Sequence, residues 1–151
     1  MREPTPAGNR RVAAGLLILR LTLSVFLLQW AREKFIVPTA TVRIAQGFYG
    51  VTLPPGIPMV LGGLELVLAL ALVGGVWRDL TYAVALIVHG VTTIVSWRQL
   101  LDPWGLAHVG GHLWIATTPV LGGFIALYLM RAWDGYSVAE WWPAREPRRA
   151  P

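Results

Sequence analysis

"GGLELVLALALVGGVWRDLTYAVALIV", residues 62–88, contains two long apolar runs joined by the four-residue turn "WRDL". The runs belong to two apolar blocks, residues 59–77 and 80–97. At a rise of 1.5 Å per residue each block spans roughly 27–28 Å as a helix, which is close to the hydrocarbon thickness of a bilayer. Because so short a turn forces neighbouring helices to run antiparallel, the stretch predicts a hairpin that crosses a membrane twice.

Two further apolar blocks, residues 12–30 and 113–130, flank this hairpin. Of the 151 residues, 55% are hydrophobic and only 14% are charged, against about 25% charged in an average soluble domain. The first block is too long for the apolar region of a cleavable signal, and Arg20 stands in its middle. The sequence therefore predicts an all-α polytopic membrane protein, an antiparallel bundle of four transmembrane helices.

The predicted organisation has a single domain. Residues 1–11 form a cytoplasmic N-terminal tail, and residues 12–131 form the four-helix transmembrane domain, with spans at about 12–30, 59–77, 80–97 and 106–130. The fourth span reaches back to 106 if its helix starts early, with Asp102 as N-cap and Pro103 in the first turn. A short interfacial helix is expected over residues 39–48 of the long outer loop between the first two spans. Residues 132–151 form an interfacial and then disordered C-terminal tail.

The basic residues predict an orientation. Eight arginines lie on the side that holds both termini, against four basic residues on the opposite side. The positive-inside rule then places the termini in the cytoplasm. The preference for arginine over lysine, twelve to one, is typical of a GC-rich bacterium, so we expect a bacterial inner membrane. The net charge of +5 is assigned to contact with anionic lipid rather than nucleic acid, and the absence of cysteine excludes disulfide and thiolate chemistry in this chain.

Three polar residues inside the spans are candidates for function, because charged groups are costly in hydrocarbon. Counted from the cytoplasmic ends of their blocks, Arg20, His89 and Glu65 lie roughly 12, 13–14 and 18–19 Å deep. They are therefore expected to form one cluster near the midplane. One interpretation is that Arg20 and Glu65 form an ion pair that locks two helices together. The other is that pair and histidine line a pocket for protons or a quinone head group. Gln29, near the outer end of the first block, either polarises the mouth of that pocket or is an interfacial residue, and the second alternative is favoured.

The remaining histidines, His108 and His112, are four residues apart and would share a helical face if the fourth helix starts early. That spacing can bind Zn²⁺ or Cu²⁺. His112 lies on the order of 9–14 Å from the depth of His89, whereas two imidazoles on one metal lie about 4 Å apart. The three histidines therefore do not form one site. Lining of the outer mouth, contact with a partner and a two-histidine metal site remain the alternatives, and no metal is assigned.

The stretches "LRLTLSVFLLQWAREKFIVP" and "GGLELVLALALVGGVWRDLTYAVALIV" resemble the DoxX family of small four-helix membrane proteins. The family pattern maps to Arg20, to Lys34 with Phe35, and to Glu65 after Gly62 and Gly63. The resemblance covers residues 16–95. It implies a link to redox systems, since such proteins include the membrane subunit of a thiosulfate:quinone oxidoreductase and members of oxidative-stress complexes.

We therefore expect an accessory membrane subunit of a redox system that contacts quinone through the Arg20, Glu65 and His89 cluster. If the chain is an enzyme, it is one only as the membrane subunit of a quinone-linked oxidoreductase. One alternative is a non-catalytic scaffold subunit of a larger membrane complex, and another is a small transporter or metal-handling protein. Besides the bilayer, a redox enzyme or other membrane subunit is the expected partner. Its docking residues are expected to be aromatic: Trp133, Trp141 and Trp142.

Overall fold

The structure, a computed structural model, describes residues 6–106 and 112–138, and every regular element among them is helical. The all-α prediction is confirmed for these residues. The longer helices are α1 (Pro6–Ile36), α3 (Ile57–Gly74), α4 (Arg78–Val95) and α6 (Thr117–Leu129). The shorter elements are α2 (Pro38–Tyr49), α5 (Trp97–Leu101) and two 3-10 turns, η1 (His112–Ala116) and η2 (Arg131–Trp133).

Three helical segments are long and apolar enough to cross a membrane. They are Arg10–Ile36, Ile57–Gly74 and Arg78–Val95, with mean hydropathies of 2.0, 2.2 and 1.2. Large apolar side chains cover their outer faces; Ile18, Val67 and Ile94 are 64%, 66% and 71% exposed. So large an apolar surface would favour aggregation in water, whereas lipid tails solvate it. The chain therefore has the helices and the surface of a membrane protein.

The fourth apolar segment is shorter than the predicted span over 106–130. The helix α6 has 13 residues, and with η1 the apolar stretch runs only from Leu113 to Leu129. The expected helix start at Asp102 is wrong. The Asp102 carboxylate accepts a 2.8 Å hydrogen bond from the backbone N–H of Leu106, and Gly105 has a φ of 73°. These features form a turn and not the start of a helix, because a residue with a left-handed backbone conformation cannot continue a right-handed α-helix.

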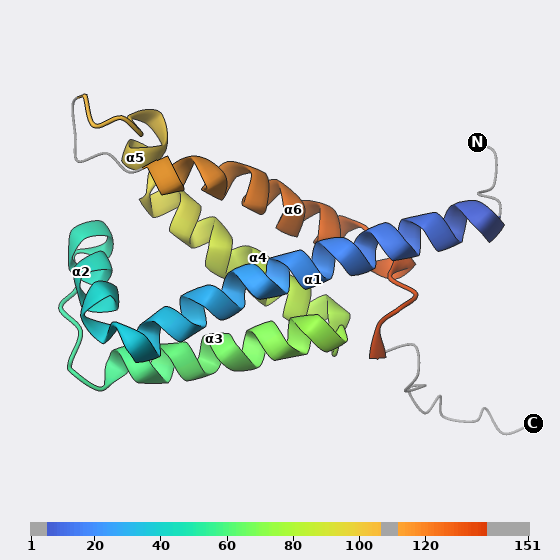
Figure 1. Cartoon of the computed structure of the whole chain (residues 1–151), viewed down its shortest axis with the longest axis horizontal. Helices are drawn as coiled ribbons and strands as arrows, with labels where there is room; N and C mark the ends of the chain where they lie inside the picture. The colour runs from blue at the N-terminus through green and yellow to red at the C-terminus, as the bar shows by residue number, and fades with distance from the viewer. Residues whose placement is uncertain (1–5, 107–111, 139–151) are drawn as a thin grey trace, which may run out of the picture.

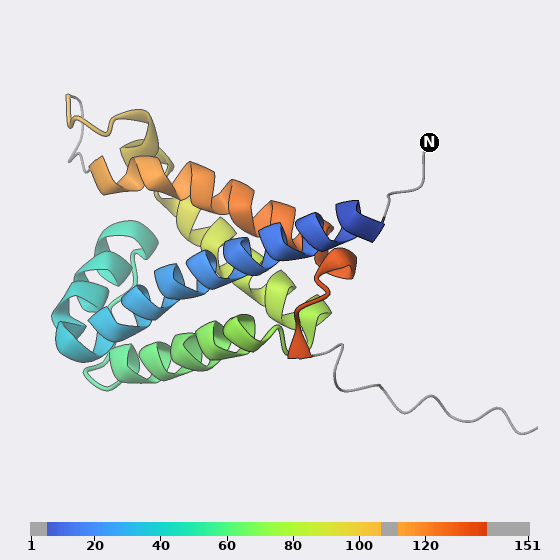
Figure 2. The same cartoon turned by 45° about the vertical axis from the view of Figure 1, so that its right-hand side comes forward.

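The long helices pack as two pairs. In Figures 1 and 2, α1 lies along α3 and α4 lies along α6. Further contacts between α1 and α6 and between α3 and α4 join the pairs. The buried core uses one face of each long helix, with Leu23 and Leu27 from α1, Leu72 from α3, Tyr82 from α4 and Phe124 from α6. The other faces stay free for lipid.

Two glycines allow the chain to reverse direction. Gly75 follows α3 with a φ of 64°, and Gly50 follows α2 with a φ of 66°. Both lie in the left-handed region, where glycine has no steric penalty. Only residues 75–77 separate α3 from α4, so the predicted tight turn is present but lies earlier than "WRDL", of which Arg78, Asp79 and Leu80 belong to α4. The helix α2, with Pro38 in its first turn, packs against both α1 and α3 near the C-terminal end of α1.

Candidate functional site

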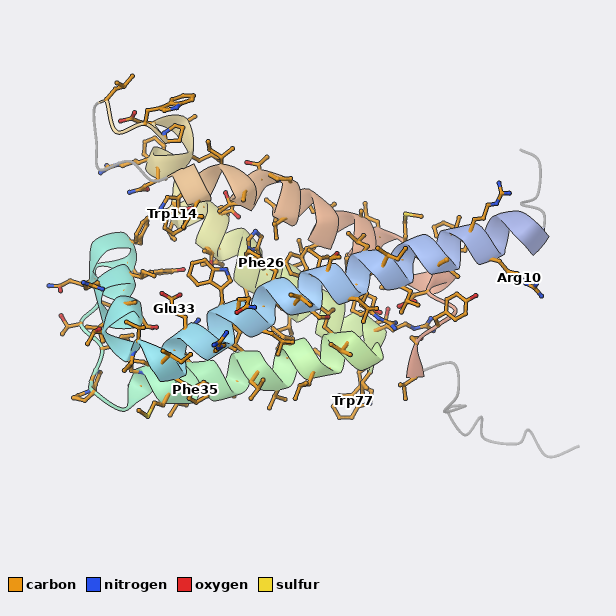
Figure 3. The ribbon with its side chains drawn as sticks, in the orientation of Figure 1. Arg10, Phe26, Glu33, Phe35, Trp77 and Trp114 are labelled. Atoms are coloured by element: carbon orange, nitrogen blue, oxygen red, sulfur yellow. The ribbon has the colours of Figure 1, made fainter. Side chains whose placement is uncertain are left out.

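A cavity of about 750 Å³ lies where α1, α2, α3 and α4 meet the start of α6. Figure 3 shows Phe26 and Glu33 of α1 and Trp114 of η1 directed into the space between α1, α2 and α4. The walls of the cavity are mostly apolar, and they include the aromatic rings of Phe26, Trp30, Tyr49 and Trp114. The polar side chains that line it are Glu33, Lys34, Thr41, Glu65, His89, Thr92 and Thr117. A large apolar cavity with a few polar groups is typical of a small-molecule site.

Lys34 and Glu65 form an ion pair in the wall of this cavity. The Lys34 ammonium donates to the Glu65 carboxylate at 2.5 Å and to the carbonyl oxygen of Trp30 at 3.2 Å. The two side chains are 17% and 13% exposed. An ammonium carries three hydrogens, so Lys34 keeps one for a ligand. The predicted ion pair between Arg20 and Glu65 is wrong, because Glu65 pairs with Lys34.

Gly62 brings the two helices close enough for this pair. A Cβ at Gly62 would lie 3.0 Å from Lys34 Cβ and 3.0 Å from Phe35 Cε2. A Cβ at the next residue, Gly63, would have no atom of another residue within 4 Å. The two adjacent glycines are therefore not equivalent: one is a packing contact between α1 and α3, and the other faces open space.

We expect Gly62→Ala to destabilise the protein and Gly63→Ala to leave it equally stable or to stabilise it. Overpacking at a helix contact costs about 1–3 kcal/mol, which outweighs the gain of up to about 1 kcal/mol from replacing glycine in a helix. Gly63→Ala causes no overpacking, so only the gain in helix stability remains. Thermal unfolding in one mild detergent measures both variants. Equal melting temperatures for the two would contradict the close contact at Gly62.

His89 lies in the inner wall of the cavity and is 4% exposed. Its Nε2 lies 3.1 Å from the carbonyl oxygen of Thr117, and its ring contacts those of Phe26 and Phe124, with centroids 5.3 Å apart in each case. Because a carbonyl oxygen only accepts, Nε2 is the donor in this contact. His89 and Glu65 thus line one cavity, as two of the three clustered residues were expected to do.

Arg20 lies outside this cavity. Its guanidinium donates to the Asp134 carboxylate at 2.5 Å and to the carbonyl oxygen of Tyr136 at 3.0 Å, and the Tyr82 hydroxyl donates to the same carboxylate at 2.5 Å. Arg20 is 2% exposed and Asp134 is fully buried. We call this group of Arg20, Tyr82 and Asp134 the Arg20 cluster. Among the described residues, Asp134 Oδ1 and Arg20 Nε have no hydrogen-bond partner.

The depth prediction for Arg20 fails because helix ends do not coincide with apolar blocks. The helix α1 begins at Pro6 and ends at Ile36, well beyond residues 12–30. Arg20 therefore lies beside Gly75 at the C-terminal end of α3, not beside Glu65 in the middle of that helix. Lys34, fourteen residues further along α1 and hence roughly 21 Å away, is the residue that reaches Glu65.

Gln29 does not belong to the cavity. It is exposed and lies with Leu28, Arg32 and Phe35 around a separate surface hollow. Its place on α1 turns it away from the face that carries Phe26, Trp30 and Lys34. The expectation that Gln29 polarises the pocket mouth is therefore wrong.

The predicted histidine pair is not tested by the described residues. His108 lies outside the described residues, and so does the side chain of His112, whose backbone opens η1. No group of three or more potential metal ligands occurs among the residues that the structure describes. Of the expected docking tryptophans, Trp133 in η2 is 55% exposed, and Trp141 and Trp142 lie outside the described residues.

Several site residues were not expected from the sequence alone. Glu33 follows the first apolar block at its predicted outer end, where interfacial residues are common, so nothing in its position singles it out. Asp134 follows the last apolar block as an ordinary tail residue. Lys34 is predicted as a site residue only through the family resemblance.

Comparison of the chain with family models, with curated proteins and with solved structures finds no match.

Proposed function

We propose that the chain is an accessory membrane subunit of a redox system, and that its cavity binds the head group of a quinone. The observation that supports this is the position of the Lys34–Glu65 pair and His89 in the wall of one apolar cavity of about 750 Å³. The spare hydrogen of Lys34 suits a quinone carbonyl oxygen, and the aromatic walls suit its flat ring.

A four-helix arrangement and an orientation belong to the same proposal. The segment Leu113–Leu129 would complete an antiparallel bundle with the three longer spans. The termini would lie in the cytoplasm of a bacterium and the cavity near the outer surface of its inner membrane, with α2 lying along that surface. The resemblance to the DoxX family, in which Lys34 and Glu65 match the family pattern, agrees with this arrangement.

A non-catalytic scaffold is the second candidate. The Arg20 cluster holds the segment after α6 against α1, and the neighbouring Trp133 and Tyr136 are 55% and 50% exposed. In such a subunit these rings would contact a redox enzyme or another membrane subunit, since aromatic residues are common anchors at interfaces. Transport or metal handling, the third possibility raised by the sequence, receives no support from a metal-binding group in the described residues.

Quinone binding is expected to depend on Lys34 and not on Gln29. We expect a short-chain benzoquinone to quench tryptophan fluorescence saturably, since Trp30 and Trp114 line the cavity. Loss of one charge-assisted hydrogen bond in Lys34→Met should weaken binding roughly tenfold to a hundredfold. Gln29→Met, on the exposed side of the same helix, is the matched control and should bind as the wild type does.

A further inference from the structure

Glu33 is a charged group in the cavity without a counter-charge. It is half-buried and lines the cavity, yet the structure gives its carboxylate no ion pair and no hydrogen bond among the described residues. The basic residues nearest in sequence outside the cavity, Arg32 and Arg43, are exposed and do not line it. A carboxylate that faces an apolar space without a partner is unfavourable, and a bound cation would relieve that cost.

The charged residues that line the cavity, among those the structure describes, have a net charge of −1. Glu33 and Glu65 each contribute one negative charge and Lys34 one positive charge, and His89 is counted as neutral at pH 7. Lys34 and Glu65 neutralise each other at 2.5 Å. The excess negative charge is therefore the carboxylate of Glu33. An anionic ligand would be repelled from this part of the cavity, and a cationic one attracted.

The walls around Glu33 are aromatic. Phe26 and Trp30 lie on its own helix, and Tyr49 and Trp114 line the cavity from α2 and η1. Figure 3 shows that Phe26, Glu33 and Trp114 point into the same space. Trp114 is held in place by Phe48, with ring centroids 4.7 Å apart. Aromatic faces attract cations that have been stripped of water, and organic ammonium groups are bound in this way.

We propose that the cavity binds an amphipathic organic cation, with a quaternary or protonated ammonium group against Glu33 and an apolar body along the aromatic walls. An inorganic cation is a poorer fit. Calcium takes six to eight oxygen ligands, whereas no group of three or more potential ligands occurs in the described part of the chain. This inference is independent of quinone binding, because it uses Glu33 and not Lys34 or His89.

The test uses the full chain in nanodiscs of neutral phosphatidylcholine. The probe is (naphthylmethyl)trimethylammonium, and its control is the uncharged carbon isostere, in which carbon replaces the ammonium nitrogen. Equilibrium dialysis measures binding, and empty nanodiscs correct for partition into lipid. We expect saturable binding with a preference of roughly tenfold for the ammonium over the isostere, as for a partly exposed charge pair beside aromatic rings.

Three variants test whether the preference for the ammonium probe comes from Glu33. Glu33→Gln keeps the shape and removes the charge, so the preference should disappear. Glu33→Asp keeps the charge and should retain most of the preference. Asp79→Asn removes a negative charge from an 87% exposed side chain outside the cavity and should change nothing.

Equal affinity for the two probes would overturn the inference, and so would a preference that survives in Glu33→Gln or is lost equally in Asp79→Asn. Failure of quinone binding with an intact ammonium preference would instead count against the proposed function alone.

Discussion

Asp134→Asn is expected to lower the free energy of unfolding by about 3–5 kcal/mol, the usual cost of removing one partner from a buried ion pair. The variant leaves the guanidinium of Arg20, which is 2% exposed, without a counter-charge. It also weakens the hydrogen bond that the Tyr82 hydroxyl donates to the carboxylate. Because the same cluster bonds to the backbone of Tyr136, the segment after α6 should loosen as well. Thermal unfolding in mild detergent, followed by circular dichroism, measures the change.

Three further variants separate the effect of a buried ion pair from a general effect of charge. Asp79→Asn breaks an ion pair with Arg131 of the same 2.5 Å length, but the Asp79 side chain is 87% exposed. Its effect should be far smaller, since solvent screens exposed pairs. The double variant Arg20→Met with Asp134→Leu should be more stable than Arg20→Met alone, because it leaves no charge buried. Equal losses in Asp134→Asn and Asp79→Asn would argue against the Arg20 cluster.

Gly75→Ala is expected to cost about 2–5 kcal/mol, from a left-handed backbone and from overpacking together. The φ of Gly75 is 64°, and a Cβ there would collide with Arg20 Nη1 and lie 2.6 Å from Ser137 Cβ. The turn between α3 and α4 and the Arg20 cluster would therefore be disturbed by one methyl group. The measurement is the same unfolding experiment.

Gly50→Ala is the matched control for this change. Gly50 has nearly the same φ, 66°, and nothing within 4 Å of a Cβ. It should show only the backbone cost of about 1–2 kcal/mol. If both variants lose equal stability, the close packing of Arg20 against the α3–α4 turn is not important for the fold.

The apolar blocks predicted the helices better than the contacts between them. Runs such as residues 59–77 mark a helix because lipid-facing and core-facing positions are both apolar, and the structure has α3 there. Block ends say little about helix ends, however, since α1 continues through Arg32, Glu33 and Lys34. The depths counted from the block ends therefore predicted the wrong partner for Arg20, Glu65 in place of Asp134.

Long-range partners were the least predictable part of the site. Asp134 lies 114 positions from Arg20, and only the course of the chain after α6 brings the two together. Glu65 and Lys34 lie 31 positions apart, and their contact depends on Gly62 as well as on charge. His89 was easier to predict, because a histidine inside an apolar helix needs a partner wherever it lies, and the carbonyl oxygen of Thr117 provides one.

We propose that Lys34, Glu65 and His89 form the polar wall of a ligand cavity. The quinone titration of Lys34→Met against Gln29→Met tests it most directly, because both variants introduce methionine on α1, one inside the cavity and one outside it. We expect saturable quenching in the wild type and in Gln29→Met, and a roughly tenfold to hundredfold weaker affinity in Lys34→Met. Non-saturable quenching, or equal affinity in all three proteins, would contradict a quinone site at this cavity.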